Sequence, residues 1–448
     1  MWKAVFATIL ATLLVTALDL SANVQLVRAF GTIHIGPDGV IDPLTTHIVT
    51  ADNVTYTFTD NVYGSIVIQR SHIIVDGSGY IVHGDGTERP DAWGFRIGIS
   101  LLGVENVTIK NTNIKGFHIG VGLEDASICT VSGSTIAANN PIGIAVTDSS
   151  NCSILGNNIG NNQVGIYLGV PRQSNLVHPS NFNVVSDNII KDNYEGIYLS
   201  PCSNFNRIFG NSVENNYWGI EFFDSFANSI LENNITHSHR GVDFRYSFRN
   251  TVSGNDITAN IQYAILFREG SAFNNVSGNT IANSSYGVCL DDSHYNFIFE
   301  NNLEHDECEL RLLTSSKNSF YHNNFMTDQT DILDSVNVWD NGYPLGGNYW
   351  GSHSIPDNDM DRIGDRPCVI DTNNADRYPL TYPYGFVPKP DVDGDGVVDN
   401  DDLSIVAMAF GSKPGDSVWT PFADADTNEV INMIDVAKTA RQYDHPIH

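Results

Sequence analysis

A run of regularly spaced acidic residues near the end of the chain has the composition of a calcium-binding loop. The stretch DVDGDGVVDNDD occupies residues 391–402, with Gly396 at its sixth place. Ca²⁺ binds oxygen ligands, and loops of this kind supply them from places 1, 3, 5, 7, 9 and 12. Here those places are held by Asp391, Asp393, Asp395, the carbonyl of Val397, Asp399 and Asp402. The spacing therefore predicts a bound calcium ion.

A second copy of the loop follows, DADTNEVINMID at residues 424–435. Its ligand places are held by Asp424, Asp426, Asn428, the carbonyl of Val430, Asn432 and Asp435. Glu429 replaces the turn glycine, which predicts a strained or weaker site. Each loop precedes a segment with helical spacing, and after the first loop one helical face collects Leu403, Val406, Ala407 and Phe410. A solvated acidic tail is the alternative, and the matching spacing of two copies argues against it.

A third acidic run, DNDMDRIGD at residues 357–365, also alternates oxygen-bearing residues. Its candidate ligands are Asp357, Asp359, Asp361, the carbonyl of Ile363 and Asp365. Arg362 stands where such a loop usually has glycine. A calcium ion that closes the preceding domain and a solvated acidic loop both remain open here.

The tandem loop and helix unit, with DGVVDNDDLSIVAMAFGS and ADTNEVINMIDVAKTARQY, resembles dockerin domains over about 391–445. The resemblance implies a small α-helical calcium-binding domain at 391–448, reached through a linker at 386–390. It also implies a cohesin-type protein partner. Dockerins read cohesin with places 10 and 11 of a loop. These are Asn400 and Asp401 in the first loop but Met433 and Ile434 in the second, so the two halves differ.

The body of the chain is built from a repeat of mostly 22–24 residues. Segments such as SGSTI, LGNNI, FGNSV and LENNI recur, and they end on Ile114, Ile136, Ile159, Ile189, Val213, Ile235, Ile257, Ile281, Leu303 and Phe325. One coil cannot bury its apolar side alone, so neighbouring coils must stack. We therefore predict an all-β parallel β-helix of roughly ten or more rungs over residues 30–385. Asn is expected at the corners, where it tolerates left-handed backbone and forms ladders.

A second repeated motif, GIxL, predicts which side chains share one outer face. Its Ile and Leu are expected to point inward, which leaves the third place outward. Down the coil that place reads Ala145, Tyr167, Tyr198, Glu221, Asp243, Leu266, Cys289 and Arg311. Two aromatic residues are thus followed by two carboxylates on adjacent rungs, and much of the scarce basic charge of the chain lies nearby in the sequence.

This column predicts a polysaccharide cleft. Glu221 and Asp243 are the candidate catalytic pair, because like charge raises the pKa of one carboxyl and leaves an acid and a base. Carboxyl groups about 5–5.5 Å apart suit retaining hydrolysis, whereas arginines that grip uronate carboxylates would support a lyase. The candidate substrate-binding residues are Tyr167, Tyr198, Trp218, Arg245 and Arg268. A solvated sheet face with local charge pairs is the alternative.

The rungs and the segment NVWDNGYPLGGNYWGSH, which begins at residue 337, resemble NosD-like and pectate-lyase-like proteins. The resemblance covers about 60–383 and implies a right-handed coil. NosD-like proteins are often described as copper-associated or carbohydrate-processing, so a copper accessory protein is an alternative function. Copper sites favour clusters of His, Met or Cys. These residues are scattered here, and His237 and His239 form the closest cluster.

The N-terminal sequence indicates where the protein is located, and the net charge limits its possible partners. Lys3 precedes an apolar run, which predicts a signal peptide at 1–29 and a secreted or cell-surface protein. An uncleaved anchor is the alternative, although the run is short for a membrane span. The net charge of −29 argues against a nucleic-acid partner and fits divalent cations or a salty exterior. An extracellular polysaccharide is the expected partner of the outer column. Cys129 and Cys152 are expected to stack on adjacent rungs, either as a disulfide or as buried thiols.

Overall fold

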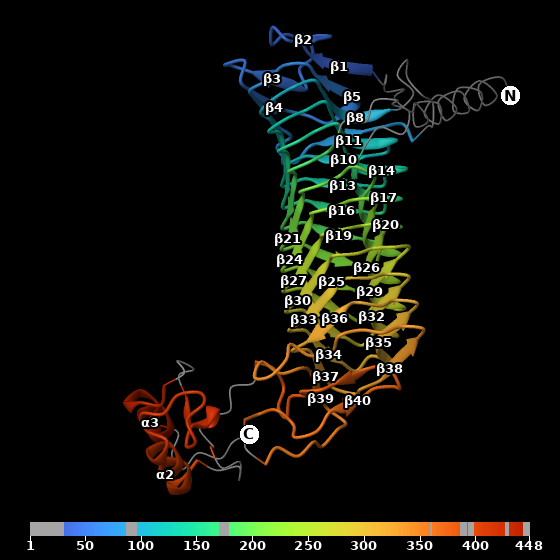
Figure 1. The fold of residues 1–448 in the computed structure, drawn as a ribbon. Coiled ribbons are helices and arrows are strands. Elements are labelled where there is room, and N and C mark those ends of the chain that lie inside the picture. The colour runs from blue at the N-terminus through green and yellow to red at the C-terminus, as the bar shows by residue number, and fades with distance from the viewer. Residues whose placement is uncertain are drawn as a thin grey trace, which may run out of the picture.

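The computed structural model describes residues 31–86, 96–169, 179–358, 361–385, 392, 398–425 and 430–441. Parallel strands stack coil upon coil into a right-handed β-helix, and a small helical segment follows it (Figure 1). The predicted all-β solenoid is thereby confirmed. The predicted signal peptide at 1–29 and linker at 386–390 lie outside the described residues, and the proposed domain boundaries stay predictions.

Each coil contributes one short strand to each of three faces, which we name A, B and C. Face A holds the longest strands and carries the candidate catalytic residues. Its strands are β1 (Gly31–Ile35), β2 (Ile41–Asp42), β5 (Val62–Ile68), β8 (Ile97–Leu102), β11 (Ile119–Glu124), β14 (Ile142–Thr147), β17 (Val164–Gly169), β20 (Glu195–Leu199), β23 (Trp218–Phe223), β26 (Arg240–Arg245), β29 (Tyr263–Arg268), β32 (Tyr286–Asp291), β35 (Cys308–Leu313) and β38 (Thr330–Leu333).

Face B counts the coils, because it forms one uninterrupted sheet of 13 strands. Its first two strands pair antiparallel, so the other eleven extend a parallel stack that starts at the second strand, which makes twelve coils. The strands are β3 (Ile48–Thr50), β4 (Thr55–Phe58), β6 (Ile73–Asp76), β9 (Val107–Lys110), β12 (Thr130–Ser132), β15 (Ser153–Leu155), β18 (Val184–Ser186), β21 (Arg207–Phe209), β24 (Ser229–Leu231), β27 (Thr251–Ser253), β30 (Asn275–Ser277), β33 (Phe297–Phe299) and β36 (Ser319–Tyr321).

Face C carries the apolar residues on which the aligned repeat segments end. Its strands are β7 (Ile81–His83), β10 (Asn113–Lys115), β13 (Thr135–Ala137), β16 (Asn158–Gly160), β19 (Ile189–Lys191), β22 (Ser212–Glu214), β25 (Asn234–Thr236), β28 (Asp256–Thr258), β31 (Thr280–Ala282), β34 (Asn302–Glu304), β37 (Asn324–Phe325) and β39 (Tyr349–Trp350). The alignment is wrong at one rung, since Ile159 pairs with Ile190 and not with Ile189, which is exposed. Asn188 takes the ladder position there and shifts the next two residues by one.

The corners are held by ladders of buried Asn side chains. The N–H of Asn157 donates to Oδ1 of Asn188 at 2.9 Å, and Nδ2 of Asn188 donates to the carbonyl of Ile154 at 2.9 Å. The ladder residues themselves do not have left-handed backbone, although other corner residues such as Asn111, Asn161 and Asn215 do, so the expectation for Asn is confirmed in part. The left-handed residue lies one place earlier, as at Gly156 and Asp187. Ladder bonding and backbone reversal are therefore done by different residues.

The core is a stack of inward-facing apolar side chains along the coil axis. Phe222, Phe244 and Phe267 stack with ring centroids 4.9 and 4.7 Å apart. Offset aromatic stacks of this kind add to the stability given by burial alone. Cys129 and Cys152 are buried on neighbouring coils as free thiols.

The C-terminal part contains the hairpin of β40 (Cys368–Val369) and β41 (Ala375–Asp376), and then α2 (Asn400–Met408), the 3₁₀ turn η1 (Pro421–Ala423) and α3 (Met433–Arg441). Val392, Val406, Ala409 and Ile431 share a small core. The predicted helix face is wrong in part, because Ala407 and Phe410 are exposed and Ala409 is buried instead. Within the described residues no helix is both long and apolar enough to cross a membrane.

Candidate functional site

The central column of face A has the register that the GIxL motif predicts. Tyr198 pairs with Glu221, and Glu221 pairs with Asp243 on the next strand. The two carboxylates are nevertheless covered, because Glu221 is 5% exposed and Asp243 is 0% exposed, so the alternative of a solvated sheet face does not hold at these two residues. Two further outward columns flank it. The leading column includes Glu195, Trp218, Arg240 and Tyr263, and the trailing column includes Phe223, Arg245 and Arg268. Their larger side chains fold over the central column.

Three successive strands of this face, β14, β17 and β20, carry an apolar outer cluster, and we call them the apolar half of the site. Ile142, Ala145, Val164 and Tyr167 form a cluster outside the coil. The ring of Tyr167 lies 5.8 Å from that of Tyr198, and its hydroxyl hydrogen-bonds Ser200 Oγ at 2.9 Å. Tyr167 is therefore packed into this cluster and does not present an open ring for sugar stacking, whereas Tyr198 is half-buried.

The next three strands, β23, β26 and β29, carry charged outer side chains, and we call them the charged half of the site. Arg268 donates from Nε to Asp243 Oδ1 at 2.9 Å and from Nη2 to Oδ2 at 3.1 Å. Arg240 donates to the same Oδ2 at 2.6 Å. Bidentate pairing of this kind fixes both partners and is strong. Asp243 therefore positions two arginines, and its lack of exposed surface keeps it from touching a substrate in this conformation.

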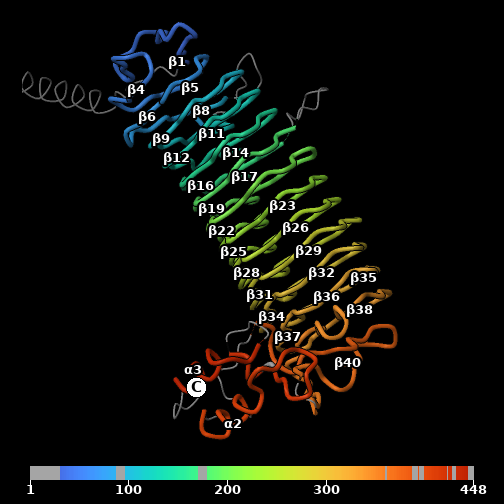
Figure 2. Tube along the Cα trace, turned by 60° about the vertical axis from the view of Figure 1, so that its left-hand side comes forward, coloured from blue at the N-terminus to red at the C-terminus, as the bar shows by residue number. Residues whose placement is uncertain are grey.

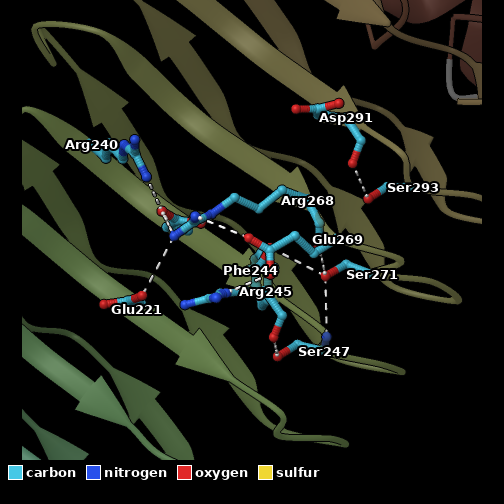
Figure 3. A network of polar contacts seen from close by, with 11 residues as sticks. Glu221, Arg240, Phe244, Arg245, Ser247, Arg268, Glu269, Ser271, Asp291 and Ser293 are labelled. Carbon is cyan, nitrogen blue, oxygen red and sulfur yellow. Dashed lines mark hydrogen bonds and ion pairs between the residues drawn. The ribbon is translucent and has the colours of Figure 1, made fainter. Parts of the chain in front are cut away.

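Glu221 lies one coil before Asp243 and is far less tightly held. Its Oε1 lies 3.6 Å from Nη2 of Arg268, which is an ion-pair distance but no hydrogen bond (Figure 3). Burial raises the pKa of Glu221 to about 7, and the negative charges of Asp243 and Glu195 add to the rise, while Arg268 opposes it. A carboxyl group that titrates near neutral pH is suited to exchange a proton with a ligand.

A further carboxylate links the arginines of the charged half. Arg245 donates from Nε to Glu269 Oε2 at 2.6 Å, and Arg268 reaches Glu269 Oε1 at 3.5 Å (Figure 3). Within the described residues Arg240 and Arg245 each donate one of these hydrogen bonds. A guanidinium has five N–H groups, so both retain donors for a ligand.

Aromatic rings border the charged half on the leading column. The guanidinium of Arg240 lies 5.9 Å from the Trp218 ring and 5.8 Å from the Tyr263 ring. Two buried donors on neighbouring strands, Nε1 of Trp218 and Nε of Arg240, have no partner among the described residues. Buried donors are usually satisfied, but both atoms lack exposed surface, so a ligand oxygen would reach them only after the side chains that cover them move.

The predicted calcium ligands are only partly described. Asp391, Asp393, Asp395, Val397, Asp426, Asn428 and Asp359 lie outside the described residues. In the third run, Asp357 accepts the N–H groups of Asp361 and Arg362 at 3.1 and 3.0 Å. Among the described residues no group of three or more His, Cys, Asp or Glu side chains is arranged to hold a metal ion. Calcium therefore stays a prediction.

Sequence reasoning underrated the leading column. Arg240, Glu195 and Tyr263 occupy the residue just before the glycine or alanine of each GIxL motif, three places before the central column. The signal was present, because that place reads Val164, Glu195, Trp218, Arg240, Tyr263 and Tyr286 down the coil. The arginine clamp on Asp243 depends on side-chain conformations that the spacing does not specify.

Comparison with protein families agrees with the architecture. Residues 173–354 match a family described as "Periplasmic copper-binding protein (NosD)". Residues 91–235 match a family described as "Right handed beta helix region". The chain is thus similar to both, and the predicted NosD-like resemblance is confirmed over 173–354. No curated protein sequence matches the chain significantly.

Several solved structures superpose on this chain at low sequence identity. The periplasmic alginate epimerase AlgG superposes with a TM-score of 0.50 at 14% identity, over 68% of this chain and 84% of that chain. The A-module of the Azotobacter vinelandii mannuronan C-5 epimerase AlgE4 gives 0.42 at 12% identity, over 68% and 91%. The Dettilon tailspike protein gives 0.47 at 16% identity, over 62% of each chain. The match to AlgG shows a common fold and nothing further.

Proposed function

We propose that this protein binds an acidic polysaccharide outside the cytoplasm along the charged half of the site, and that Glu221 exchanges a proton with the bound sugar. The observation that carries the proposal is the buried Glu221 carboxyl, whose pKa is raised to about 7 beside an arginine pair held by Asp243. Such a perturbed group in an ordered polar network is typical of functional sites.

The choice of an acidic ligand rests on the distribution of charge. The chain has a net charge of −29, yet Arg240, Arg245 and Arg268 gather on two neighbouring strands. Carboxylates are favoured by the planar donor geometry of arginine. The charged half and its borders also hold the carboxylates of Glu195, Glu221, Asp243 and Glu269, so the unused N–H groups of the arginines, and not a net positive charge, would attract a sugar carboxylate.

The chemistry follows from which groups can reach the ligand. Arg240 and Arg245 would hold a sugar carboxylate, and Trp218 and Tyr263 would lie against the rings. Glu221 would then take a proton from the carbon next to that carboxylate, or give one to the glycosidic oxygen. Asp243 acts here as a positioning residue, which replaces the expected pair of catalytic carboxylates.

Both comparisons support the place and the ligand class. One matched family is described as periplasmic, and the AlgG structure with the same fold is named for its action on alginate. We therefore place this protein outside the cytoplasm, as the N-terminal sequence also predicts.

The test is an activity panel with matched variants. The purified chain is incubated with neutral and uronate polysaccharides, and reducing ends, unsaturated-product absorbance and solvent-deuterium incorporation are recorded. Product or exchange from the wild type that is lost in Glu221→Gln and kept in Glu214→Gln, on face C, supports the proposal. Equal turnover in Glu221→Gln, or binding of neutral chains alone, would overturn it.

We also propose that residues 391–402 and 424–435 bind calcium and attach the chain to a protein partner of the cohesin type. Support comes from matching geometry in the two units. Oδ2 of Asp402 accepts the N–H of Asp399 at 2.7 Å, and Oδ2 of Asp435 accepts the N–H of Asn432 at 2.7 Å. Calcium should raise the melting temperature of this segment in the wild type and in Asp401→Asn, but not in Asp393→Asn. An unchanged melt with calcium would contradict the proposal.

A further inference from the structure

One corner ladder ends on a residue that breaks its own pattern. The ladder between faces C and A runs through Asn139, Asn162, Asn193, Asn216, Ser238, Asn260, Ser284 and Asp306, where each side-chain oxygen accepts the N–H of the residue one coil earlier. Every member before the last carries a donor group as well as an acceptor. Asp306 carries a donor only if its carboxyl group is protonated.

The second oxygen of Asp306 occupies the position of an amide nitrogen. A Cβ built on Gly241 would lie 3.1 Å from Nδ2 of Asn260, and one built on Gly287 would lie 2.7 Å from Oδ2 of Asp306. Nδ2 of Asn260 donates to the carbonyls of Ile235 and Thr258 at 3.2 and 3.3 Å. The equivalent carbonyls near Asp306 belong to Ile281 and Glu304, by the register of β31 with β34.

If Asp306 were ionised, its second oxygen, an acceptor, would face two further acceptors, the carbonyls of Ile281 and Glu304. Asp306 is 4% exposed, and its Oδ2 has no hydrogen-bond partner among the described residues. Its other oxygen accepts the N–H of Ser284 at 2.6 Å. A buried acceptor without a donor costs free energy, and a buried charge without a partner costs more. A protonated carboxyl removes the conflict, because its O–H donates where Nδ2 donates in the coils before.

We propose that Asp306 is a proton-dependent lock, which closes the last coils as a neutral carboxylic acid and loosens them when it loses the proton. These coils, from β34 to β38, lie next to the C-terminal part of the chain (Figure 2). Loosening would spread to the residues that follow, since Glu309 on β35 accepts the N–H groups of Met326, Thr327 and Asp328.

The charged surroundings of Asp306 favour the neutral form. Burial raises the pKa of Asp306 to about 7, and Glu304 at the end of β34 adds to the rise, while the N–H of Ser284 opposes it. Glu304 lies 3.9 Å from His305. Glu309 follows on β35 of the same coil, and Asp328 lies on the next coil, where it bonds the exposed His353 at 2.8 Å. The neighbours on the preceding coil, Ser284 and Gly287, are uncharged. No basic side chain pairs with Asp306 within the described part of the chain.

The direction of the pH effect follows from these values. The pKa of Asp306 is about 7 in the folded chain against an ordinary value of 3.8. The stabilising contribution of its proton is therefore full below about pH 4, is lost progressively as the pH rises to about 7, and does not change further above that. Burial also raises the pKa of Glu309 to about 7, so the test must isolate Asp306.

The variant Asp306→Asn isolates the contribution of Asp306 to the pH dependence, because the amide restores the ladder pattern without a titrating group. We expect the melting temperature of Asp306→Asn to exceed that of the wild type by about 2–4 °C at pH 8 and to match it within about 1 °C at pH 4.5. Hydrogen exchange, corrected for the intrinsic rate, should show protection of residues 302–333 falling about tenfold more between pH 5 and pH 8 in the wild type than in Asp306→Asn, since Glu309 titrates in both.

A reciprocal variant tests whether a carboxyl group at another place in the same ladder has the same pH-dependent effect. Asn260→Asp places the same carboxyl two coils earlier, away from Glu304 and Glu309, and should lower the melting temperature at pH 8 and recover at pH 4.5. Identical pH dependence in the wild type and Asp306→Asn would overturn the proposal. So would an Asp306→Asn variant that is less stable than the wild type at pH 8, or an Asn260→Asp variant that melts like the wild type throughout.

Discussion

The two halves of the site share one backbone register but differ in what their central column carries. Around Tyr167 the column is apolar, and the outer side chains collapse into a closed cluster. Around Asp243 the column is acidic, and arginines from both flanking columns close over it. The backbone is the same in both halves, so three outward side chains per coil decide whether a coil is only packed or also carries titratable chemistry.

The largest effect is expected from opening the arginine clamp. Asp243→Asn leaves Arg240 and Arg268 half-buried without their anion, and should lower the free energy of unfolding by about 3 kcal/mol. Urea unfolding followed by circular dichroism measures it. A loss below about 1 kcal/mol would mean that the arginines repair the network elsewhere and that Asp243 does not position them.

A smaller, pH-dependent effect is expected at Glu221. Its pKa of about 7 in the folded chain lies above the ordinary value of 4.5, so ionisation destabilises the fold progressively from about pH 4.5 to 7. Glu221→Gln should therefore be more stable than the wild type by about 2 kcal/mol at pH 8 and equal to it at pH 4. A constant difference across this range would show that Glu221 does not titrate with a raised pKa.

In the apolar half the corresponding change should be independent of pH. Tyr167→Phe removes the hydroxyl bonded to Ser200 and should cost about 1 kcal/mol at every pH. Thermal melts of this variant and of Glu221→Gln, run side by side at pH 5 and pH 8, sharpen the comparison. A pH-dependent Tyr167→Phe would contradict the division into a packed half and a titrating half.

The smallest effect on stability, but a clear one on binding, is expected at Arg245. Its side chain is 39% exposed and paired with Glu269, so Arg245→Gln should change the free energy of unfolding by less than about 0.5 kcal/mol. Affinity for an acidic oligosaccharide should fall about tenfold in titration calorimetry, as for the loss of one charge-assisted hydrogen bond. Arg207→Gln, on face B, is the matched control, and equal losses in both variants would point to nonspecific attraction.

Much of the fold was predictable because a solenoid repeats one local rule. The 22–24-residue period predicted the coil and the pairing of Glu221 with Asp243, since in-register stacking converts sequence period into spatial columns. The predicted alignment of Ile189 was wrong because Asn188, with its buried hydrogen bonds, sets the register more strictly than the apolar residue beside it. The burial of Asp243 was not predicted, because it depends on the conformations of the long side chains of Arg240 and Arg268, which sequence spacing does not specify.

The central claim is that the charged half binds ligand and the apolar half does not. Hydrogen exchange of the chain with and without an acidic oligosaccharide tests it most directly. We predict protection confined to residues 195–269 and lost in Glu221→Gln/Arg245→Gln. Protection centred on residues 119–169, or binding that leaves both halves unchanged, would contradict the account.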